Sequence, residues 1–304
     1  MNTPIVGYKA KALEPRNLAF FFLIAFGWSW LWWALFIFGI LKMPAGIGTS
    51  EVDLGSAGPL ILIIMLTPFG PTIGAFVMTA MTEGRTGVKT LWRRFWNRSL
   101  SIKWLLVILM FFPAFQLIAN FVSRTLDNQA YPFLAYPNQP WMFIPPFIAN
   151  TLINAGMSEE FGWRGYALPR FQARWNALTS SIVLGAIWAA WHIPLWFVPG
   201  DSHNHVFFWG WAGRIILLST LMTWIFNNTN GSILAAVLFH GMANSVDDLF
   251  LYGGSEWCYN GVRLLVVILI VVVFGSKNLI RHGNSPFVHG GRRLTESLQE
   301  SNTG

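Results

Sequence analysis

The sequence predicts an all-α membrane protein that crosses the bilayer about eight times and carries a polar site within the membrane. Of its 304 residues, 54% are hydrophobic and 11% are charged, whereas ordinary soluble domains are about 25% charged. The mean hydropathy is +0.48. The 17 Trp and 26 Phe are typical of helices anchored at lipid headgroups. A few ionisable residues interrupt the apolar segments, and such residues mark functional sites.

The apolar segments predict the individual spans, because crossing about 30 Å of hydrocarbon takes roughly 20 helical residues. The first segment is too long for a signal peptide and lacks a small-residue cleavage site, so we expect an uncleaved anchor. Residues 17–281 are therefore expected to form one membrane domain. Its eight expected spans are 17–41, 57–81, 104–123, 141–161, 177–197, 206–226, 232–251 and 262–280.

An even number of spans puts both termini on the same side of the membrane. The loops of the other side hold only Lys42, Arg124 and Arg263. The positive-inside rule therefore predicts a multi-pass protein, in the cell membrane if it is bacterial, with both termini in the cytoplasm. The basic residues on the predicted cytoplasmic side are Lys9, Lys11, Arg16, Arg85, Lys89, Arg93, Arg94, Arg98, Lys103, Arg164, Arg170, Arg174, Lys277, Arg281, Arg292 and Arg293.

Three segments are expected outside the spans. Residues 1–16 form a cytoplasmic tail, and residues 282–304, rich in Gly, Ser, Asn and Arg, are expected to be disordered. Residues 86–98 place apolar and basic side chains on opposite helical faces, which predicts an interfacial helix on the cytoplasmic leaflet. The net charge of +7 is spread over short loops, so membrane lipids and no nucleic acid are the expected partners.

A small set of polar side chains in the spans forms the candidate site. Residues four apart share a helix face, so Glu160 can pair with Arg164 while Glu159 points about 100° away. Arg214 is interpreted as structural, either paired with a carboxylate or snorkelling toward the membrane surface, and Asp247 as a solvated loop charge. The candidate site comprises Glu159, Glu160, Arg164, His192, His240 and Asn244.

These groups can divide the work of amide hydrolysis between a base that deprotonates water and donors for the oxyanion. Alternatively, Glu159, His192 and His240 could hold Zn²⁺ with an open fourth position, although no HExxH occurs. A covalent nucleophile is not expected, because Cys258 falls in a predicted outer loop and no Ser lies in a GxSxG motif.

Three motifs, in this order, resemble those of the CAAX protease and bacteriocin-processing family of intramembrane peptidases, also called the abortive-infection family. A Glu pair followed by Arg occurs in MSEEFGWRGYALPRF, and His-x-x-x-Asn in SILAAVLFHGMANS. Between them, Trp188 and His192 in IWAAWHIPLW match an aromatic residue followed by His, with Trp where the family usually has Phe. The resemblance covers roughly residues 70–245.

The resemblance implies an intramembrane endopeptidase that acts on a membrane-associated peptide or protein. Glu159 would activate water with His192 as its partner, and His240 with Asn244 would stabilise the oxyanion. Glu160 and Arg164 would support the base. Similar proteins include the eukaryotic endopeptidase that removes the last three residues of prenylated CAAX proteins, and bacterial proteins of bacteriocin maturation or self-immunity. A metal-free glutamate mechanism is preferred to the zinc mechanism.

Two other functions stay open. A non-enzymatic binding or immunity protein could use the same cavity to hold a peptide, and intramembrane carboxylates and His also mark transporters. No pair of matching interrupted segments suggests the inverted repeats of a transporter. Straight helices would leave Glu159 and His192 at different depths, so we expect tilt, a kink at Pro194, or a fourth helix that continues toward Pro169.

Overall fold

The fold is entirely helical in the part of the chain that the structure describes. The computed structural model describes residues 14–43, 54–96, 100–127, 139–249 and 256–281, and these ranges contain helices and no strand. The all-α prediction is therefore confirmed. The predicted C-terminal tail, 282–304, and residues 1–13 of the N-terminal tail lie outside the described residues.

Five helical stretches are long and apolar enough to cross a membrane, and a shorter apolar helix covers Ile233–Asp247. The chain is thus an integral, multi-pass membrane protein. The five stretches are Pro15–Ile37, Leu60–Phe95, Ile102–Leu126, Ala177–Phe197 and Glu256–Phe274. The main helices are α1 (Pro15–Ile37), α2 (Leu54–Leu66), α3 (Gly70–Phe95), α4 (Ile102–Asp127), α8 (Ala177–Trp191), α9 (Phe208–Asn228), α10 (Ile233–Leu249) and α11 (Glu256–Phe274).

The fourth expected span, 141–161, differs from the prediction, because it is a series of short elements and not one helix. Ala155, with φ −147° and ψ −58°, leaves the helical conformation and separates the π-helical turn η4 from α6. Pro145 and Pro146 in α5 lack the N–H groups of a regular helix. The series is η3 (Pro140–Phe143), α5 (Ile144–Ala149), η4 (Asn150–Asn154), α6 (Gly156–Gly162), η5 (Trp163–Ala167) and α7 (Leu168–Gln172).

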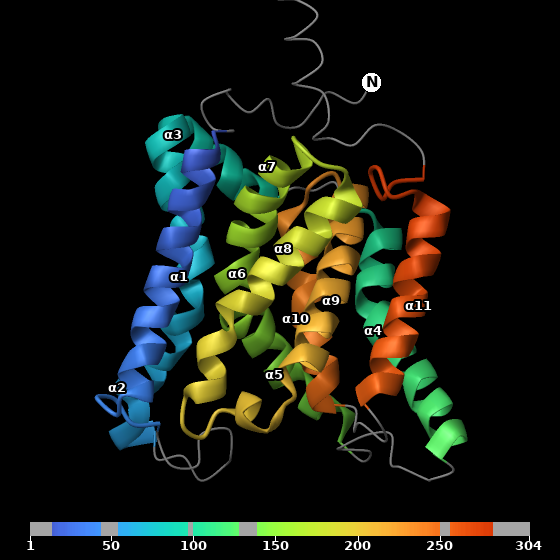
Figure 1. Ribbon diagram of the computed structural model, residues 1–304, viewed down its shortest axis with the longest axis horizontal. Coiled ribbons are helices and arrows are strands. Elements are labelled where there is room, and N and C mark those ends of the chain that lie inside the picture. The colour runs from blue at the N-terminus through green and yellow to red at the C-terminus, as the bar shows by residue number, and fades with distance from the viewer. Residues whose placement is uncertain (1–13, 44–53, 97–99, 128–138, 250–255, 282–304) are drawn as a thin grey trace, which may run out of the picture.

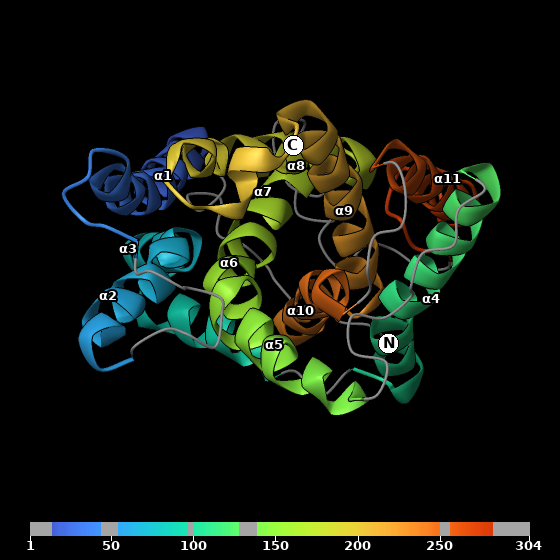
Figure 2. The ribbon, with the colours of Figure 1, turned by 90° about the horizontal axis from the view of Figure 1, so that it is seen from below.

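The broken segment lies between two flanks of longer helices (Figures 1 and 2). α6 to α10 lie in the middle, α1, α2 and α3 lie on one flank, and α4 with α11 on the other. The beginning of α1 and the end of α11 lie at the same end of the bundle (Figure 1). Which side of the membrane this end faces stays a prediction.

α3 changes direction at Gly84, whose φ of 67° and ψ of −163° interrupt the helix. Gly adopts such a positive φ without the steric cost that a side chain brings. The second limb of α3 contains most of the predicted interfacial helix, 86–98. Residues 97 and 98 of that prediction lie outside the described part, and its position on a leaflet stays a prediction.

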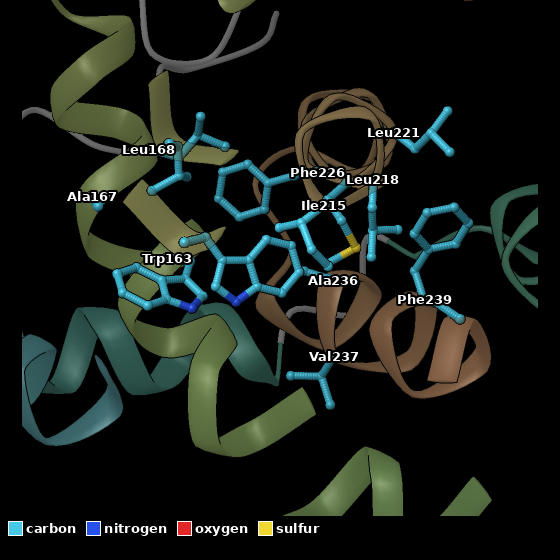
Figure 3. Close-up of a cluster of buried hydrophobic side chains, with 14 of the residues drawn as sticks. Trp163, Ala167, Leu168, Ile215, Leu218, Leu221, Phe226, Ala236, Val237 and Phe239 are labelled. Carbon is cyan, nitrogen blue, oxygen red and sulfur yellow. The ribbon is translucent and has the colours of Figure 1, made fainter. Parts of the chain in front are cut away.

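Two close approaches fix α6 between α3 and α10. A Cβ on Gly162 would lie 2.5 Å from the backbone oxygen of Pro71 in α3, and a Cβ on Gly156 would lie 2.9 Å from the backbone oxygen of Val237 in α10. Trp163 of the neighbouring η5 belongs to the same buried hydrophobic cluster as Ala236, Val237 and Phe239 of α10 (Figure 3). The core therefore holds the short helix that carries Glu159.

Candidate active site

A cavity of about 420 Å³ contains four of the six predicted site residues in its wall. Glu159 comes from α6, His192 follows the last residue of α8, and His240 and Asn244 lie one turn apart on α10. Glu160 and Arg164 are fully buried directly behind this wall. Side chains from three separate segments thus meet at one polar cavity.

The carboxylate of Glu159 is held by two indoles. Its Oε2 accepts a 2.9 Å hydrogen bond from Nε1 of Trp163 and a 2.6 Å hydrogen bond from Nε1 of Trp188. Glu159 is only 3% exposed, so hydrogen bonds are needed to offset the cost of burying it. Because both donors bind Oε2, Oε1 accepts no hydrogen bond from the described residues and is available for a water molecule or a substrate.

Trp188 is the common neighbour of the predicted site residues. Its ring centroid lies 5.0 Å from that of His240 and 6.1 Å from that of His192. The guanidinium of Arg164 lies over its face, 4.6 Å from the ring centroid. A Phe here would supply a ring for this packing but no N–H for Glu159, so the departure from the family motif adds a hydrogen bond.

Glu160 links Arg164 to His240. Its Oε1 accepts a 3.0 Å hydrogen bond from Nη1 of Arg164 and lies 2.8 Å from Nδ1 of His240. The predicted Glu160–Arg164 pair is confirmed, and the pair contacts His240 more directly than it contacts Glu159. With Nδ1 of His240 bound to the carboxylate, Nε2 is the ring nitrogen left for the cavity.

His192 is oriented by its own helix. Its Nδ1 lies 2.9 Å from the backbone oxygen of Trp188, so Nδ1–H donates and Nε2 is free to accept a proton or a hydrogen bond. α7 continues the broken fourth segment past Pro169, and α8 ends at Trp191, before a 3₁₀ turn, η6 (Ile193–Phe197), that contains Pro194. One expected arrangement, a fourth segment that stays helical past Pro169, therefore occurs, whereas α8 ends before Pro194.

The sequence interpretation missed a third imidazole at the cavity, that of His203. Nδ1 of His203 lies 2.6 Å from Oδ1 of Asp201, and its ring centroid lies 6.3 Å from that of His192. Both residues lie in or beside the 3₁₀ turn η7 (Ser202–His205) and line the cavity. The Asp-x-His spacing was the available signal, but a loop position gave no reason to place it near His192.

The expected pairing of Arg214 with a carboxylate is confirmed, and the interpretation of Asp247 as a solvated loop charge is wrong. Arg214 of α9 forms an ion pair with Asp247 of α10, and both line the cavity. Asp247 lies in a helix, with a side chain that is 19% exposed, because α10 extends to Leu249. The pair therefore joins two helices at the wall of the site.

The three residues that could have held Zn²⁺ are not arranged as a metal site. Within the described ranges, no group of three His, Cys, Asp or Glu side chains is placed to hold a metal ion. Oε2 of Glu159 is already bound by two indoles, and Nδ1 of His240 by Glu160. These residues, as the structure places them, therefore do not fit a zinc ion.

Fold and site together define a polytopic membrane protein with a buried carboxylate–imidazole site. Residues 140–246 match the family described as "Type II CAAX prenyl endopeptidase Rce1-like", and this range contains all six predicted site residues. The chain is also 27% identical over 226 residues to the CAAX prenyl protease 2 of Methanococcus maripaludis, an alignment that covers 71% of this chain and 83% of that protein. These findings confirm the resemblance to the CAAX protease and bacteriocin-processing family, and they support a protease of the CAAX type.

Proposed function

We propose that this intramembrane endopeptidase hydrolyses peptide bonds of membrane-associated proteins or peptides with water activated by Glu159. The observation that carries the proposal is the carboxylate of Glu159, which two indoles hold through one oxygen at a cavity shared with His192 and His240. A fixed carboxylate with a free second oxygen suits a general base.

In the proposed reaction, Glu159 takes a proton from a water molecule that Nε2 of His192 helps to orient. The hydroxide attacks the carbonyl carbon of the scissile bond. Asn244 and, when it carries both ring protons, Nε2–H of His240 donate to the oxyanion that develops on the carbonyl oxygen. Glu159 then returns the proton to the leaving amine, and the C–N bond breaks.

Glu160 and Arg164 have a positioning role in this proposal. Glu160 holds the ring of His240 through Nδ1, and Arg164 compensates the charge of Glu160 in a fully buried pair. Removing one member of such a pair leaves the other charge unpaired. The pair thus keeps Nε2 of His240 directed at the reacting carbonyl.

The substrate is proposed to be a prenylated CAAX protein, the class that the name "CAAX prenyl protease 2" gives for the Methanococcus relative. Part of the cavity wall is apolar and includes Trp33, Phe36 and Ile64. Such a surface suits an apolar substrate segment, while the polar wall faces the peptide bond.

The test uses the purified full chain in proteoliposomes with a membrane-tethered, prenylated peptide that ends in a CAAX sequence. Mass spectrometry identifies the products and the bond that is cut. Glu159→Gln should lower the rate by about 10²–10⁴-fold, the range for loss of a general base. The matched control is Glu256→Gln, because Glu256 is exposed at the start of α11; it should retain the full rate.

If Glu159→Gln cleaved the peptide at the wild-type rate, Glu159 would not be the general base. Two other functions predict other results. A non-enzymatic binding or immunity protein would leave the peptide intact, and its phenotype would survive Glu159→Gln. A transporter would accumulate a solute in the same liposomes without changing the peptide.

A further inference from the structure

A groove along α3, formed by residues that do not line the candidate active site, combines apolar and basic side chains. It has a volume of about 520 Å³ and is lined by residues of both limbs of α3. Phe76, Ala80, Val88 and Trp92 are spaced by multiples of four residues, so they follow one face of the helix across the bend at Gly84. The bend turns this face into a continuous apolar groove.

Two basic side chains stand over the apolar groove. Arg85 and Lys89 line it and are exposed. The described residues offer no ion-pair partner to either side chain, and the nearest acid in the sequence, Glu83, is bound by Arg170 at 2.9 Å. The groove therefore combines an apolar floor with two uncompensated positive charges.

The apolar floor and the two positive charges indicate which kind of molecule would bind in the groove. The apolar floor fits an acyl chain, and the two cations fit a phosphate group with a net negative charge. The first limb of α3 belongs to a stretch that can cross a membrane, while Trp92 and Trp96 are 42% and 61% exposed, as aromatic residues at the headgroup level often are. We propose that the groove at the bend of α3 binds one anionic phospholipid.

The groove also contacts the helix that carries the site. The ring of Trp92 is stacked on that of Phe161, with centroids 5.7 Å apart and an angle of 11°, and the ring of Phe76 lies 5.2 Å from Phe161. Phe161 follows Glu160 directly in α6. A lipid in the groove therefore packs against the aromatic layer behind the two glutamates, and its presence should favour one position of α6.

The binding test uses the delipidated full chain in detergent and measures the binding of phosphatidylglycerol and phosphatidylcholine by native mass spectrometry. The wild type should bind phosphatidylglycerol more tightly than phosphatidylcholine. Arg85→Gln with Lys89→Gln should weaken binding of phosphatidylglycerol by about 30-fold, since two basic residues near an anionic surface contribute that much. Binding of phosphatidylcholine should change less.

The matched control is Arg93→Gln with Lys103→Gln, which removes the same charge from exposed residues outside the groove. It should keep the wild-type affinity. Ala80→Phe, which fills the apolar floor, should weaken both lipids. The proposal would be overturned if the groove and control variants lost the same affinity for phosphatidylglycerol. It would also be overturned if the wild type bound the two lipids equally, or if millimolar inorganic phosphate displaced the lipid.

The effect on activity rests on the proposed function and is measured separately. In proteoliposomes, phosphatidylglycerol should raise the cleavage rate of the wild type but not that of Arg85→Gln with Lys89→Gln. Lipid binding without any cleavage in the wild type would contradict the proposed function and leave the lipid site intact. Cleavage without selective lipid binding would contradict the lipid site and leave the proposed function intact.

Discussion

The indole N–H of Trp188 donates a 2.6 Å hydrogen bond to Oε2 of Glu159, although the two residues lie on different helices. The same indole packs against His240 and supports the guanidinium of Arg164. One side chain thus connects the proposed base with the groups proposed to stabilise the oxyanion.

Trp188→Phe should keep this packing and remove the hydrogen bond. A hydrogen bond to a charged group contributes about 1.5–3 kcal/mol, so we expect kcat of peptide cleavage to fall by at least about tenfold. Trp28→Phe is the control, because its indole donates to the backbone oxygen of Leu66 and does not line the cavity. Equal rates for Trp188→Phe and the wild type would show that the N–H on Glu159 has no role in the reaction.

Glu160→Gln should reduce both stability and activity. It leaves Arg164 buried without a carboxylate, and breaking a buried pair typically costs about 3–5 kcal/mol. Thermal unfolding in detergent measures this loss, and the cleavage rate measures the loss of His240 orientation. Glu14→Gln should have little effect on Tm, because the Glu14–Arg16 pair is exposed, with a separation of 3.7 Å. A Tm for Glu160→Gln equal to that of the wild type would contradict the buried pair.

Gly162→Ala should destabilise the protein, because its Cβ would lie 2.5 Å from backbone and side-chain atoms of Pro71. α3 and α6 would have to separate, and overpacking of this kind costs about 1–3 kcal/mol. Gly213→Ala in α9 is the control, since nothing lies within 4 Å of its Cβ position. It should leave Tm unchanged or raise it. Similar Tm values for the two variants would argue against close contact between α3 and α6.

Chelation should leave the cleavage rate unchanged. Glu159, His192 and His240 do not form a metal-binding group in the described part of the chain, so the proposed reaction depends on protein side chains and water. The rate is measured before and after treatment with 1,10-phenanthroline, together with the metal content of the purified protein. Loss of activity that added Zn²⁺ restores would contradict the glutamate mechanism.

Residues within one helical turn could be paired from the sequence alone. The spacing of four predicted that Glu160 bonds Arg164, and it could also have indicated that Trp163 reaches Glu159, since these residues are four apart. The hydrogen bond from Trp188 spans 29 residues and depends on how α8 crosses α6. No periodic pattern contains that information.

The broken fourth segment was equally hidden from the sequence. Its apolar content from residue 141 to 161 satisfies the length of a span, and hydropathy does not distinguish one helix from several short ones. The break at Ala155 depends on the tight contacts of Gly156 with Thr151 and Val237. These contacts belong to the folded molecule, so only three-dimensional packing determines where the helix stops and starts again.

α6 is only seven residues long, and an isolated helix of that length is unstable in water. Packing against α3 and α10, and not the helix propensity of its own residues, therefore holds α6 in its helical conformation. Substitutions that raise the helix propensity of α6 should change the stability of the protein little. Substitutions that shift α3 or α10 should change the cleavage rate, although they alter no reacting group.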